Sequence, residues 1–520
     1  MTTFTLPCVK RTLSQRRPGG RLCHPQSRQG SLGRTPLFVA NGIIGGLAVA
    51  GPDAASWDRR NTLTGAVVTR AAACSPAEAE RAADAAAAAF PHWSTLPPEQ
   101  RASCLCAAAD RLTEATETLV ATAGQELGAA PGWVRFNVDV ACAMLRQAAS
   151  LATEVGERAA PSAAPGMRYA LCRRPAGVVL GLAPWNAAVT LAVRAVAAPL
   201  ALGNTVVLKA SELCPKTHET VVLALMRAGL PDGVLNFVTN APEDAHAVVE
   251  ALIAHPAVRR VNFTGSTRVG REIAVMAARH LKKCLLELSG KGTMIVLADA
   301  DLDGAARAAA HGAFFNQGQV CMSTDRIVVE QAVAGAFVDR LRVEAERLRA
   351  DLAAGAGPLG AVISPEAVTR LRGLIEDAVA RGARLVTGGE AVGTAMQPTV
   401  LDHVAFGMRL HDEEVFGPVV GVIRVADADE AVTVANDSEF GLAASVFGAD
   451  LDRARAVAGQ IEAGIVHVNG STVYDDPAMP FGGMKASGYG RFGGHAAVEE
   501  FTEVQWRTER DEPAPDRLGR

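Results

Sequence analysis

Hydrophobic and polar positions along residues 177–287 switch repeatedly between two periods. Short runs of aliphatic and β-branched residues predict buried strands at 177–183, 204–209, 233–238 and 259–265. Each run precedes a stretch whose pattern predicts a helix, at 187–202, 215–229, 241–254 and 267–281. Strands that alternate with helices indicate a parallel sheet of the doubly wound type.

A second alternating region follows Glu287. Strands are predicted at 293–297, 326–330, 419–425, 443–448 and 464–469, with helices between them. The predicted fold class is therefore α/β, with two doubly wound, Rossmann-like parallel-sheet domains. Residues 57–156 instead have a helical, alanine-rich pattern, in which Ser75 and Glu78 form a capping-box signature at 75–90.

Composition narrows the class of protein. At 520 residues the chain is long enough for two or three domains. A charged content of 20% and a net charge of −4 indicate a globular enzyme with no electrostatic footprint for nucleic acid. The most apolar stretch, around 172–208, is interrupted by prolines, Asn186 and Arg194, so no membrane span is expected.

Cysteine spacing favours a reduced, cytoplasmic protein without a metal centre. The ten cysteines form no CxxC pairs and no Cys/His cluster with zinc-finger spacing. The first 34 residues are rich in arginine, and no acidic residue precedes Asp53. This start resembles an organelle transit peptide, but a disordered extension or a start codon assigned too far upstream accounts for it equally well.

The segment FFNQGQVC, which ends at Cys321, holds most of the functional information. A lone cysteine is most often a buried core residue. This one is accompanied by APWN (183–186), KASE (209–212), FTGSTRVG (263–270), ELSGK (287–291) and EEVFGP (413–418). In this order and spacing the segments resemble the NAD(P)-dependent aldehyde dehydrogenase superfamily, over roughly residues 37 to 508.

The resemblance implies a set of catalytic residues. An aldehyde becomes a hydride donor only after a thiolate has added to its carbonyl carbon, and the resulting thioester must then be hydrolysed. Cys321 would be the nucleophile, Asn186 the donor to the oxyanion, and Glu287 the base that activates water. Ser289 stands where the family has a glycine, next to this base.

Each assignment has a structural alternative. An asparagine at a strand-to-helix turn is often a helix N-cap, which is the alternative for Asn186. Residues 282–288 predict a further buried strand, and a carboxylate at the end of such a strand is often solvated or paired with a cation, which is the alternative for Glu287. Burial without a partner would instead raise its pKa toward neutrality and make it a competent base.

The resemblance also implies a cofactor site for NAD, with NADP as an alternative. A helix N-terminus after a strand can bind a pyrophosphate, and an acidic residue near the ribose disfavours a 2′-phosphate. Glu212 would be that acid, beside Lys209. Glu414 would hold the nicotinamide ribose unless it is merely a surface acid, and Phe416 would lie against the nicotinamide ring unless it is a core aromatic. The full predicted set is Trp185, Lys209, Glu212, Gly265, Ser266, Gly270, Leu288, Glu414 and Phe416.

Within the superfamily, residues 240–266, 318–329 and 479–506 look most like dehydrogenases of salicylaldehyde, vanillin and benzaldehyde. Small Ala187 leaves room for an aromatic ring, and Arg194 could bind a ring hydroxyl unless it is an ordinary surface charge. The predicted pocket comprises Ala187, Leu191, Arg194, Met322 and Tyr474, with Trp133 as a further wall residue. Aliphatic or semialdehyde oxidation and a catalytically silent, NAD-binding relative are the alternatives.

Domain boundaries follow from the same resemblance. Residues 1–36 would lie outside the fold, 37–156 and 176–287 would bind the cofactor, and 288–489 would form the catalytic domain. Residues 157–175 and 490–520 would form an oligomerisation arm and a C-terminal tail. A strand of this kind needs a partner edge, so a homodimer or homotetramer is expected. The other expected partner is a small-molecule aldehyde.

Overall fold

A computed structural model of the chain describes residues 37–51, 54–162, 166–349 and 358–511. The predicted extension at 1–36 and the last nine residues of the predicted tail lie outside these ranges. Contacts join Leu37–Arg520 into one compact unit, so the division into cofactor-binding and catalytic domains stays a prediction. None of the helices within the described ranges has the length and apolarity of a membrane span.

The first sheet contains the five strands predicted before Ser289. They run parallel: β8 (Val178–Leu182), β9 (Thr205–Lys209), β10 (Leu235–Val238), β11 (Val258–Thr264) and β12 (Lys283–Glu287). The spatial order is β24-β12-β11-β8-β9-β10-β2-β3, so the chain turns back at β8. A crevice forms where strand order reverses, outside the carboxyl ends of β8 and β11.

Three short strands complete this sheet at its edges. β2 (Gly42–Ile44) pairs antiparallel with β10, β3 (Leu47–Val49) pairs with β2, and β24 (Gly488–Tyr489) pairs with β12. The end of the predicted catalytic span 288–489 therefore belongs to the first sheet. The sequence pattern could not reveal this, because a two-residue strand has no detectable period.

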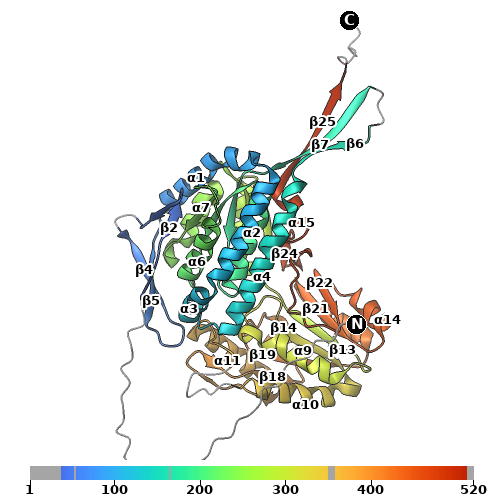
Figure 1. The fold of residues 1–520 in the computed structure, drawn as a ribbon. Helices are drawn as coiled ribbons and strands as arrows, with labels where there is room; N and C mark the ends of the chain where they lie inside the picture. Colours follow the sequence, from blue (N-terminus) through green and yellow to red (C-terminus); the bar gives the residue numbers. More distant parts are fainter. Residues whose placement is uncertain (1–36, 52–53, 163–165, 350–357, 512–520) are drawn as a thin grey trace, which may run out of the picture. The chain divides into compact units, whose positions relative to one another are not determined.

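Helices follow the parallel strands as predicted. They are α5 (Ala188–Ala201), α6 (Pro215–Met226), α7 (Ala245–Ala254) and α8 (Thr267–Arg279). The alanine-rich region supplies α1 (Pro76–Thr95), α2 (Pro98–Glu114), α3 (Thr116–Leu127) and α4 (Pro131–Ser150), which lie beside them (Figure 1). The capping box at the start of α1 is confirmed: the Ser75 amide donates to Glu78 Oε2 at 2.8 Å.

One part of the helical prediction is wrong. Residues 56–72 contain two strands, β4 (Ser56–Arg60) and β5 (Val67–Ala72), and β5 lies between β4 and β1 (Phe38–Ala40) and pairs with both. The β-branched residues Val67, Val68 and Thr69 favour a strand. The partner β1 lies almost thirty residues upstream, so the local pattern did not reveal the pairing.

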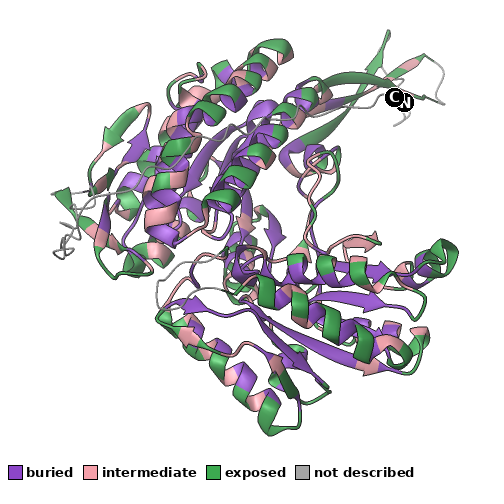
Figure 2. Ribbon diagram, turned by 60° about the horizontal axis from the view of Figure 1, so that its bottom comes forward, coloured by how far each residue is buried: buried purple, intermediate pink, exposed green. Residues whose placement is uncertain are grey.

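The second sheet has the order β15-β18-β19-β14-β13-β21-β22. All five predicted strands are confirmed, as β13 (Gly292–Val296), β14 (Thr324–Glu330), β19 (Val419–Val425), β21 (Ala443–Phe447) and β22 (Ile465–Val468). β18 (Thr399–Asp402) and antiparallel β15 (Arg384–Thr387) extend one edge. The helices are α9 (Leu302–Phe314), α10 (Gln331–Arg347), α11 (Pro365–Ala380), α13 (Ala428–Asn436) and α14 (Leu451–Ala458). Figure 2 shows buried strands beside helices whose outer faces are exposed.

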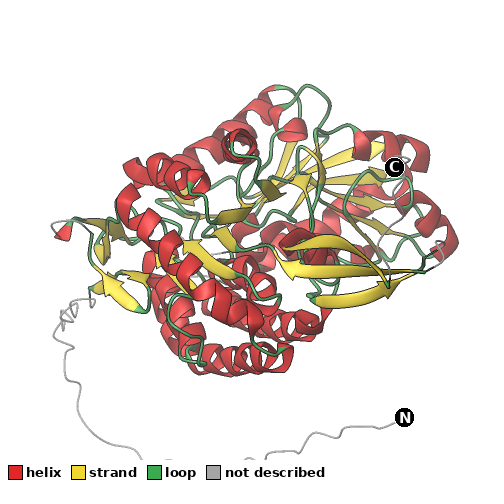
Figure 3. Cartoon of the chain, turned by 90° about the horizontal axis from the view of Figure 1, so that it is seen from above, coloured by secondary structure: helices red, strands yellow, loops and turns green. Residues whose placement is uncertain are grey.

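A separate three-stranded sheet projects beyond these layers. β25 (Thr502–Arg510) pairs antiparallel along the whole of β7 (Met167–Pro175), and β6 (Gly156–Ala160) covers the other edge of β7 (Figure 3). Strands β6 and β7 fall on the arm predicted at 157–175, and β25 falls on the arm and tail predicted at 490–520. Residues 496–501 of the predicted arm and tail form a helix, α15 (Ala496–Phe501), which packs near α5.

Candidate active site

Cys321 follows a strained turn. After α9 the chain passes through a short 3-10 segment, Phe315–Gly318, in which Asn316, Gln317 and Gly318 have φ values of 50°, 55° and 67°. A Cβ atom at Gly290 would lie 2.3 Å from the Cys321 carbonyl oxygen, so glycine is required for this close approach. Close backbone packing at Gly290 therefore helps to position the segment that carries the thiol.

Asn186 lies at the carboxyl end of β8, opposite this turn. Its Nδ2 donates to the Gln319 carbonyl at 3.0 Å, and its own carbonyl accepts from Trp133 Nε1 at 3.0 Å. Helix α5 has Ala187 as its N-cap, without a side-chain capping bond. The side chain of Asn186 is thus not used as a helix cap, and it is held against the loop that carries Cys321.

Glu287 is the last residue of β12, and its side chain is buried. Within the described structure neither carboxyl oxygen has a hydrogen-bond partner. Burial raises the pKa of Glu287 to about 7, against the opposing effects of Arg194 and the Cys321 thiol. Glu287 is therefore neither a solvated strand end nor half of a salt bridge, and near neutral pH it can both accept and release a proton.

The thiol itself favours its protonated form. Burial raises the pKa of Cys321 well above its ordinary value, the Glu287 carboxylate raises it further, and Arg194 lowers it. Because the thiolate is the nucleophile, the proton must leave as the thiol attacks. A neighbouring carboxylate with a pKa near 7 is a suitable acceptor.

Two cavities meet at the thiol. The first, here called the polar cavity, measures about 420 Å³, and Glu287, Ser289, Arg370, Glu414 and Phe416 lie among the residues that line it. The second, here called the aromatic cavity, measures about 50 Å³. Within the described ranges, Asn186 and Cys321 are the only residues found in both linings. A molecule in one cavity would therefore meet a molecule in the other at these two side chains.

Glu414 faces the polar cavity instead of bulk solvent. Its Oε1 accepts from the Gly290 amide at 3.1 Å, and burial raises its pKa to about 7. Phe416 has a φ of 46° and lies edge-on to Trp185, with ring centroids 5.8 Å apart. Neither residue matches its alternative as a surface acid or a core aromatic, because both line the cavity.

A third cavity of about 490 Å³, here called the distal cavity, continues from the polar cavity. The two share Pro184, Trp185, Thr264 and Gly265, at the carboxyl ends of β8 and β11. Lys209 and Glu212 line the distal cavity and form an ion pair with each other. Burial opposes ionisation of Glu212, but Lys209 prevails and lowers its pKa.

The remaining predicted cofactor residues divide into two groups. Gly265, Ser266 and Leu288 line the polar cavity, although the Ser266 hydroxyl also caps α8 by accepting from the Val269 amide. Gly270 lies outside both cavities. A Cβ atom there would lie 2.3 Å from the Leu288 side chain, so this glycine is needed for packing.

All five predicted pocket residues line the aromatic cavity. They are Ala187, Leu191, Arg194, Met322 and Tyr474, and Trp133 joins them. Sequence analysis missed Phe136, Val140, Thr190, Val320, Val473, Asp475 and Phe481. Phe136 and Val140 lie three and seven positions after Trp133 on α4, so helical spacing could have found them. The others share no periodicity with a predicted residue, except Thr190, which lies on the same helix as Ala187.

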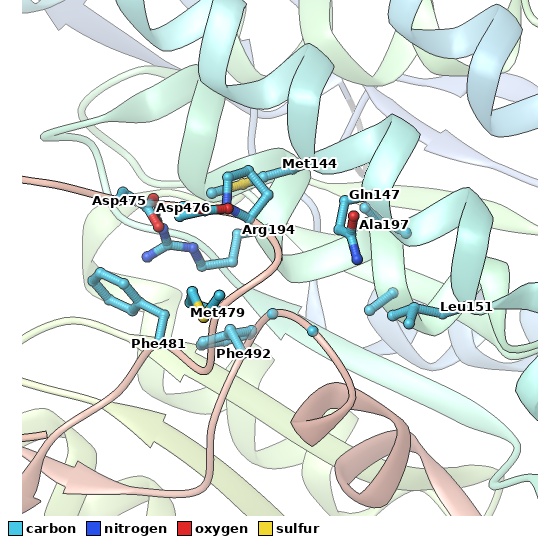
Figure 4. A pocket seen from close by; sticks show the side chains of 15 residues that line it. Met144, Gln147, Leu151, Arg194, Ala197, Asp475, Asp476, Met479, Phe481 and Phe492 are labelled. Carbon is cyan, nitrogen blue, oxygen red and sulfur yellow. Dashed lines mark hydrogen bonds and ion pairs between the residues drawn. The ribbon is translucent and has the colours of Figure 1, made fainter. Parts of the chain in front are cut away.

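Arg194 is buried, so it is not a surface charge. Its guanidinium forms an ion pair with Asp475 and lies 3.9 Å from the centroid of the Phe481 ring. Figure 4 shows this arrangement, with Phe492 and Met479 beside it. Within the described ranges no group of three or more His, Cys, Asp or Glu side chains could hold a metal ion, and the cysteines there are free.

Comparison with known proteins agrees with this geometry. Residues 50–507 match the model of the aldehyde dehydrogenase family. The chain belongs to this family. Aldehyde dehydrogenases are oxidoreductases that act on aldehydes and use NAD or NADP.

Several relatives of this aldehyde dehydrogenase have named substrates. A vanillin dehydrogenase of Pseudomonas fluorescens is 52% identical, over 91% of this chain and 98% of the relative. A salicylaldehyde dehydrogenase of Pseudomonas putida is 43% identical, over 91% and 98%. The crystal structure of a salicylaldehyde dehydrogenase from Pseudomonas putida G7, complexed with salicylaldehyde, superposes with a TM-score of 0.89 at 42% identity and covers 92% of this chain and 100% of that one.

Proposed function

We propose that this aldehyde dehydrogenase oxidises aromatic aldehydes to carboxylic acids with NAD. The proposal rests mainly on one observation: among the residues that the structure describes, Cys321 and Asn186 alone line both the polar and the aromatic cavity. A nucleophile at this junction can hold a substrate carbon while the polar side of the site is occupied by a dinucleotide. The names of the vanillin, salicylaldehyde and benzaldehyde relatives support the substrate class.

Cys321 and Asn186 act in the first half of the reaction, which converts the aldehyde to a thioester. The thiol sulfur adds to the carbonyl carbon, and its proton passes to the Glu287 carboxylate. The carbonyl oxygen becomes an oxyanion, and the second N–H of Asn186 Nδ2, which is not needed by Gln319, can donate to it. When bound, the oxidised nicotinamide supplies the acceptor for the hydride that leaves this carbon, which remains as a thioester of Cys321.

Glu287 carries the second half. Once the proton taken from the thiol has passed to solvent, the ionised Glu287 removes a proton from a water molecule, and the resulting hydroxide adds to the thioester carbon. The carbon–sulfur bond then breaks, the carboxylic acid leaves, and the Cys321 thiolate takes back the proton that Glu287 holds. A carboxyl with a pKa near 7 is ionised in about half of the molecules at neutral pH, as this step requires.

The shape of the aromatic cavity supports an aromatic substrate. Trp133 stacks on Phe136 with centroids 5.7 Å apart, and Phe481 also lines the cavity. Ala187 is the residue next to the oxyanion donor, and its small side chain leaves width for a ring. Aromatic walls favour flat rings by offset and edge-on contacts. The guanidinium of Arg194 remains the candidate partner of a ring hydroxyl.

NAD is proposed over NADP because Glu212 lies in the distal cavity. Its carboxylate would repel a 2′-phosphate and accept hydrogen bonds from a ribose. Arg268 and His246 also line this cavity, which is why the preference needs a direct test. Residues 37–156 and 176–287 are the proposed cofactor-binding domain, and residues 288–489 the proposed catalytic domain, apart from β24.

A homodimer or homotetramer is proposed from the projecting three-stranded sheet. Leu171, Val504 and Trp506 are 46%, 51% and 65% exposed on it. Exposed apolar side chains on a sheet with open edges favour contact with another polypeptide, and a second copy of the chain is the simplest partner. Sedimentation analysis of the purified protein tests this.

The proposed function is tested by NADH formation from benzaldehyde, salicylaldehyde, vanillin, hexanal and succinic semialdehyde. We expect kcat/KM to be highest for the aromatic aldehydes. A preference for succinic semialdehyde or hexanal would contradict the proposed substrate class. Failure to oxidise any of them, with NAD still bound, would identify a catalytically silent relative.

A further inference from the structure

Two opposite charges face the aromatic cavity, and they neutralise each other. Of the described residues that line it, only Arg194 and Asp475 carry a charge at neutral pH. Their side chains are 6% and 10% exposed and form an ion pair. Arg194 comes from α5, whereas Asp475 comes from the segment after β22, 281 residues later.

Surrounding side chains hold this pair in place. The Phe481 ring lies 3.9 Å and the Phe492 ring 5.9 Å from Arg194 Cζ, so aromatic faces cover the guanidinium. A small cavity of about 40 Å³, here called the rear cavity, lies behind (Figure 4). Arg194, Asp475 and Phe481 line both the aromatic and the rear cavity, so the ion pair separates the two.

We propose that Asp475 is a positioning residue that sets the charge selectivity of the aromatic cavity. By pairing with Arg194 it keeps the cavity neutral overall, so that the enzyme admits uncharged aldehydes and rejects aldehydes that carry a carboxylate. This inference rests on the proposed function, because it assumes that the aldehyde occupies the aromatic cavity.

The physical reason is the cost of an unbalanced buried charge. Arg194 alone would attract a carboxylate on a substrate, because a buried cation needs an anionic partner. With Asp475 present, that carboxylate would have to compete for the guanidinium and would add a further acidic group beside Asp475. Specificity of this kind depends on repulsion of the unwanted ligand as much as on attraction of the correct one.

The pair still leaves hydrogen-bond donors for a neutral group. An arginine has five N–H donors, and the contact with Asp475 Oδ2 uses Nη2 of Arg194. A ring hydroxyl can therefore accept from Arg194 without displacing Asp475. A carboxylate, which recognises guanidinium best through two parallel hydrogen bonds, would be in direct competition with it.

The experiment compares aldehydes that differ only in charge. We would measure kcat/KM for 3- and 4-carboxybenzaldehyde and for their neutral methyl esters. In the wild-type enzyme kcat/KM should be at least about tenfold higher for the ester than for the carboxylate. This factor corresponds to the loss of one charge-assisted hydrogen bond. In Asp475→Asn the ratio should shift toward the carboxylate by about tenfold or more, because Arg194 is then unbalanced, and the shift should appear mainly in KM.

Two further variants separate charge from structure. Asp476→Asn makes the same chemical change one residue away, outside the aromatic cavity, and should leave the ratio as in the wild type. Arg194→Met/Asp475→Leu removes both charges and should not gain the carboxylate preference, since no cation remains. A gain in this double variant, or a shift in Asp476→Asn, would overturn the inference.

The outcome is informative even if Asp475→Asn does not fold. A wild-type preference for the carboxylate over its ester would by itself overturn the inference, because it would mean that Arg194 is available to anions. An unchanged ratio in a folded Asp475→Asn variant would do the same. If the wild type instead oxidises none of the four aromatic aldehydes, the proposed function fails, which is a different result.

A pH profile gives a readout that a purely structural role would not change. The charged and titratable groups that act on Glu287 are Arg194, Cys321, Glu414 and Asp475, and Asp475 raises the pKa of Glu287. Its removal should therefore lower that pKa and move the acidic limb of the pH–rate profile to lower pH. If the acidic limb lies at the same pH in Asp475→Asn as in the wild type, the electrostatic coupling of Asp475 to Glu287 is contradicted.

Discussion

The two cavities that meet at Cys321 are built in different ways. The polar cavity, of about 420 Å³, is lined by segments that follow strand ends, and glycines let backbones approach closely there. The aromatic cavity, of about 50 Å³, is lined by side chains from α4, α5 and the segments around 320 and 473–481. Backbone topology thus shapes the cavity proposed for the cofactor, and side-chain identity shapes the cavity proposed for the aldehyde.

The largest loss of activity is expected when the thiol of Cys321, which lines both cavities, is removed. Cys321→Ala should lower NADH formation on the order of 10⁴-fold or more, because no thiohemiacetal can form. Binding of NAD, measured by fluorescence titration, should persist, since the polar cavity remains. Cys106→Ala, an exposed cysteine elsewhere, is the matched control and should behave as the wild type. Turnover near the wild-type level in Cys321→Ala would exclude this mechanism.

Removal of the base should separate the two half-reactions. Glu287→Gln should show one burst of NADH and then stall, with steady-state turnover lowered about 10²- to 10⁴-fold. Intact-mass spectrometry should detect the thioester on the protein. If the burst itself disappears, Glu287 is needed to accept the thiol proton, and its role belongs to the first half-reaction.

The same residue sets the pH dependence of the wild type. Only the ionised form of Glu287 is a base, so steady-state turnover should rise with pH through about 7, the pKa that burial produces. The raised pKa of Cys321 acts in the same direction. Stopped-flow measurement of the burst and the steady state across pH 5.5 to 9 tests this. A turnover that is flat over this range would contradict it.

A smaller change in activity is expected when only the aromatic cavity is altered. Arg194→Met/Asp475→Leu removes the ion pair without leaving one charge unpaired, which is the better tolerated change. We expect KM for salicylaldehyde and vanillin to rise by about tenfold, the cost of one charge-assisted hydrogen bond. Benzaldehyde, which has no hydroxyl, serves as the internal control. Equal losses on all three substrates would assign the pair to the scaffold only.

The smallest change in activity is expected for Glu212, in the distal cavity. Glu212→Gln should reduce the preference for NAD over NADP by about tenfold, because a neutral side chain no longer repels the 2′-phosphate. The measurement is kcat/KM for each dinucleotide with a fixed aldehyde. Glu243→Gln, another acid at the distal cavity, provides the matched comparison. An unchanged ratio in Glu212→Gln would assign Glu212 to pairing with Lys209 alone.

The sequence predicted more of the polar cavity than of the aromatic one. Asn186, Glu287, Cys321 and Glu414 each sit in a short, ordered motif, and all of them line the polar cavity. Phe481 and Asp475 belong to no periodic pattern, and they reach the aromatic cavity only through the path of the chain after β22. Gly270 shows the reverse case, a motif residue whose role is packing against Leu288.

Local periodicity and contiguous motifs were enough to predict the ten parallel strands, the helices after them and the three residues proposed for catalysis. Tertiary structure alone decided the strands at 56–60 and 67–72, the entry of residues 488–489 into the first sheet, and the pairing of Arg194 with Asp475. These depend on contacts between residues far apart in the chain. The pKa of Glu287 near 7 is likewise a tertiary property, because it arises from burial and from three charges and one thiol that four separate segments bring together.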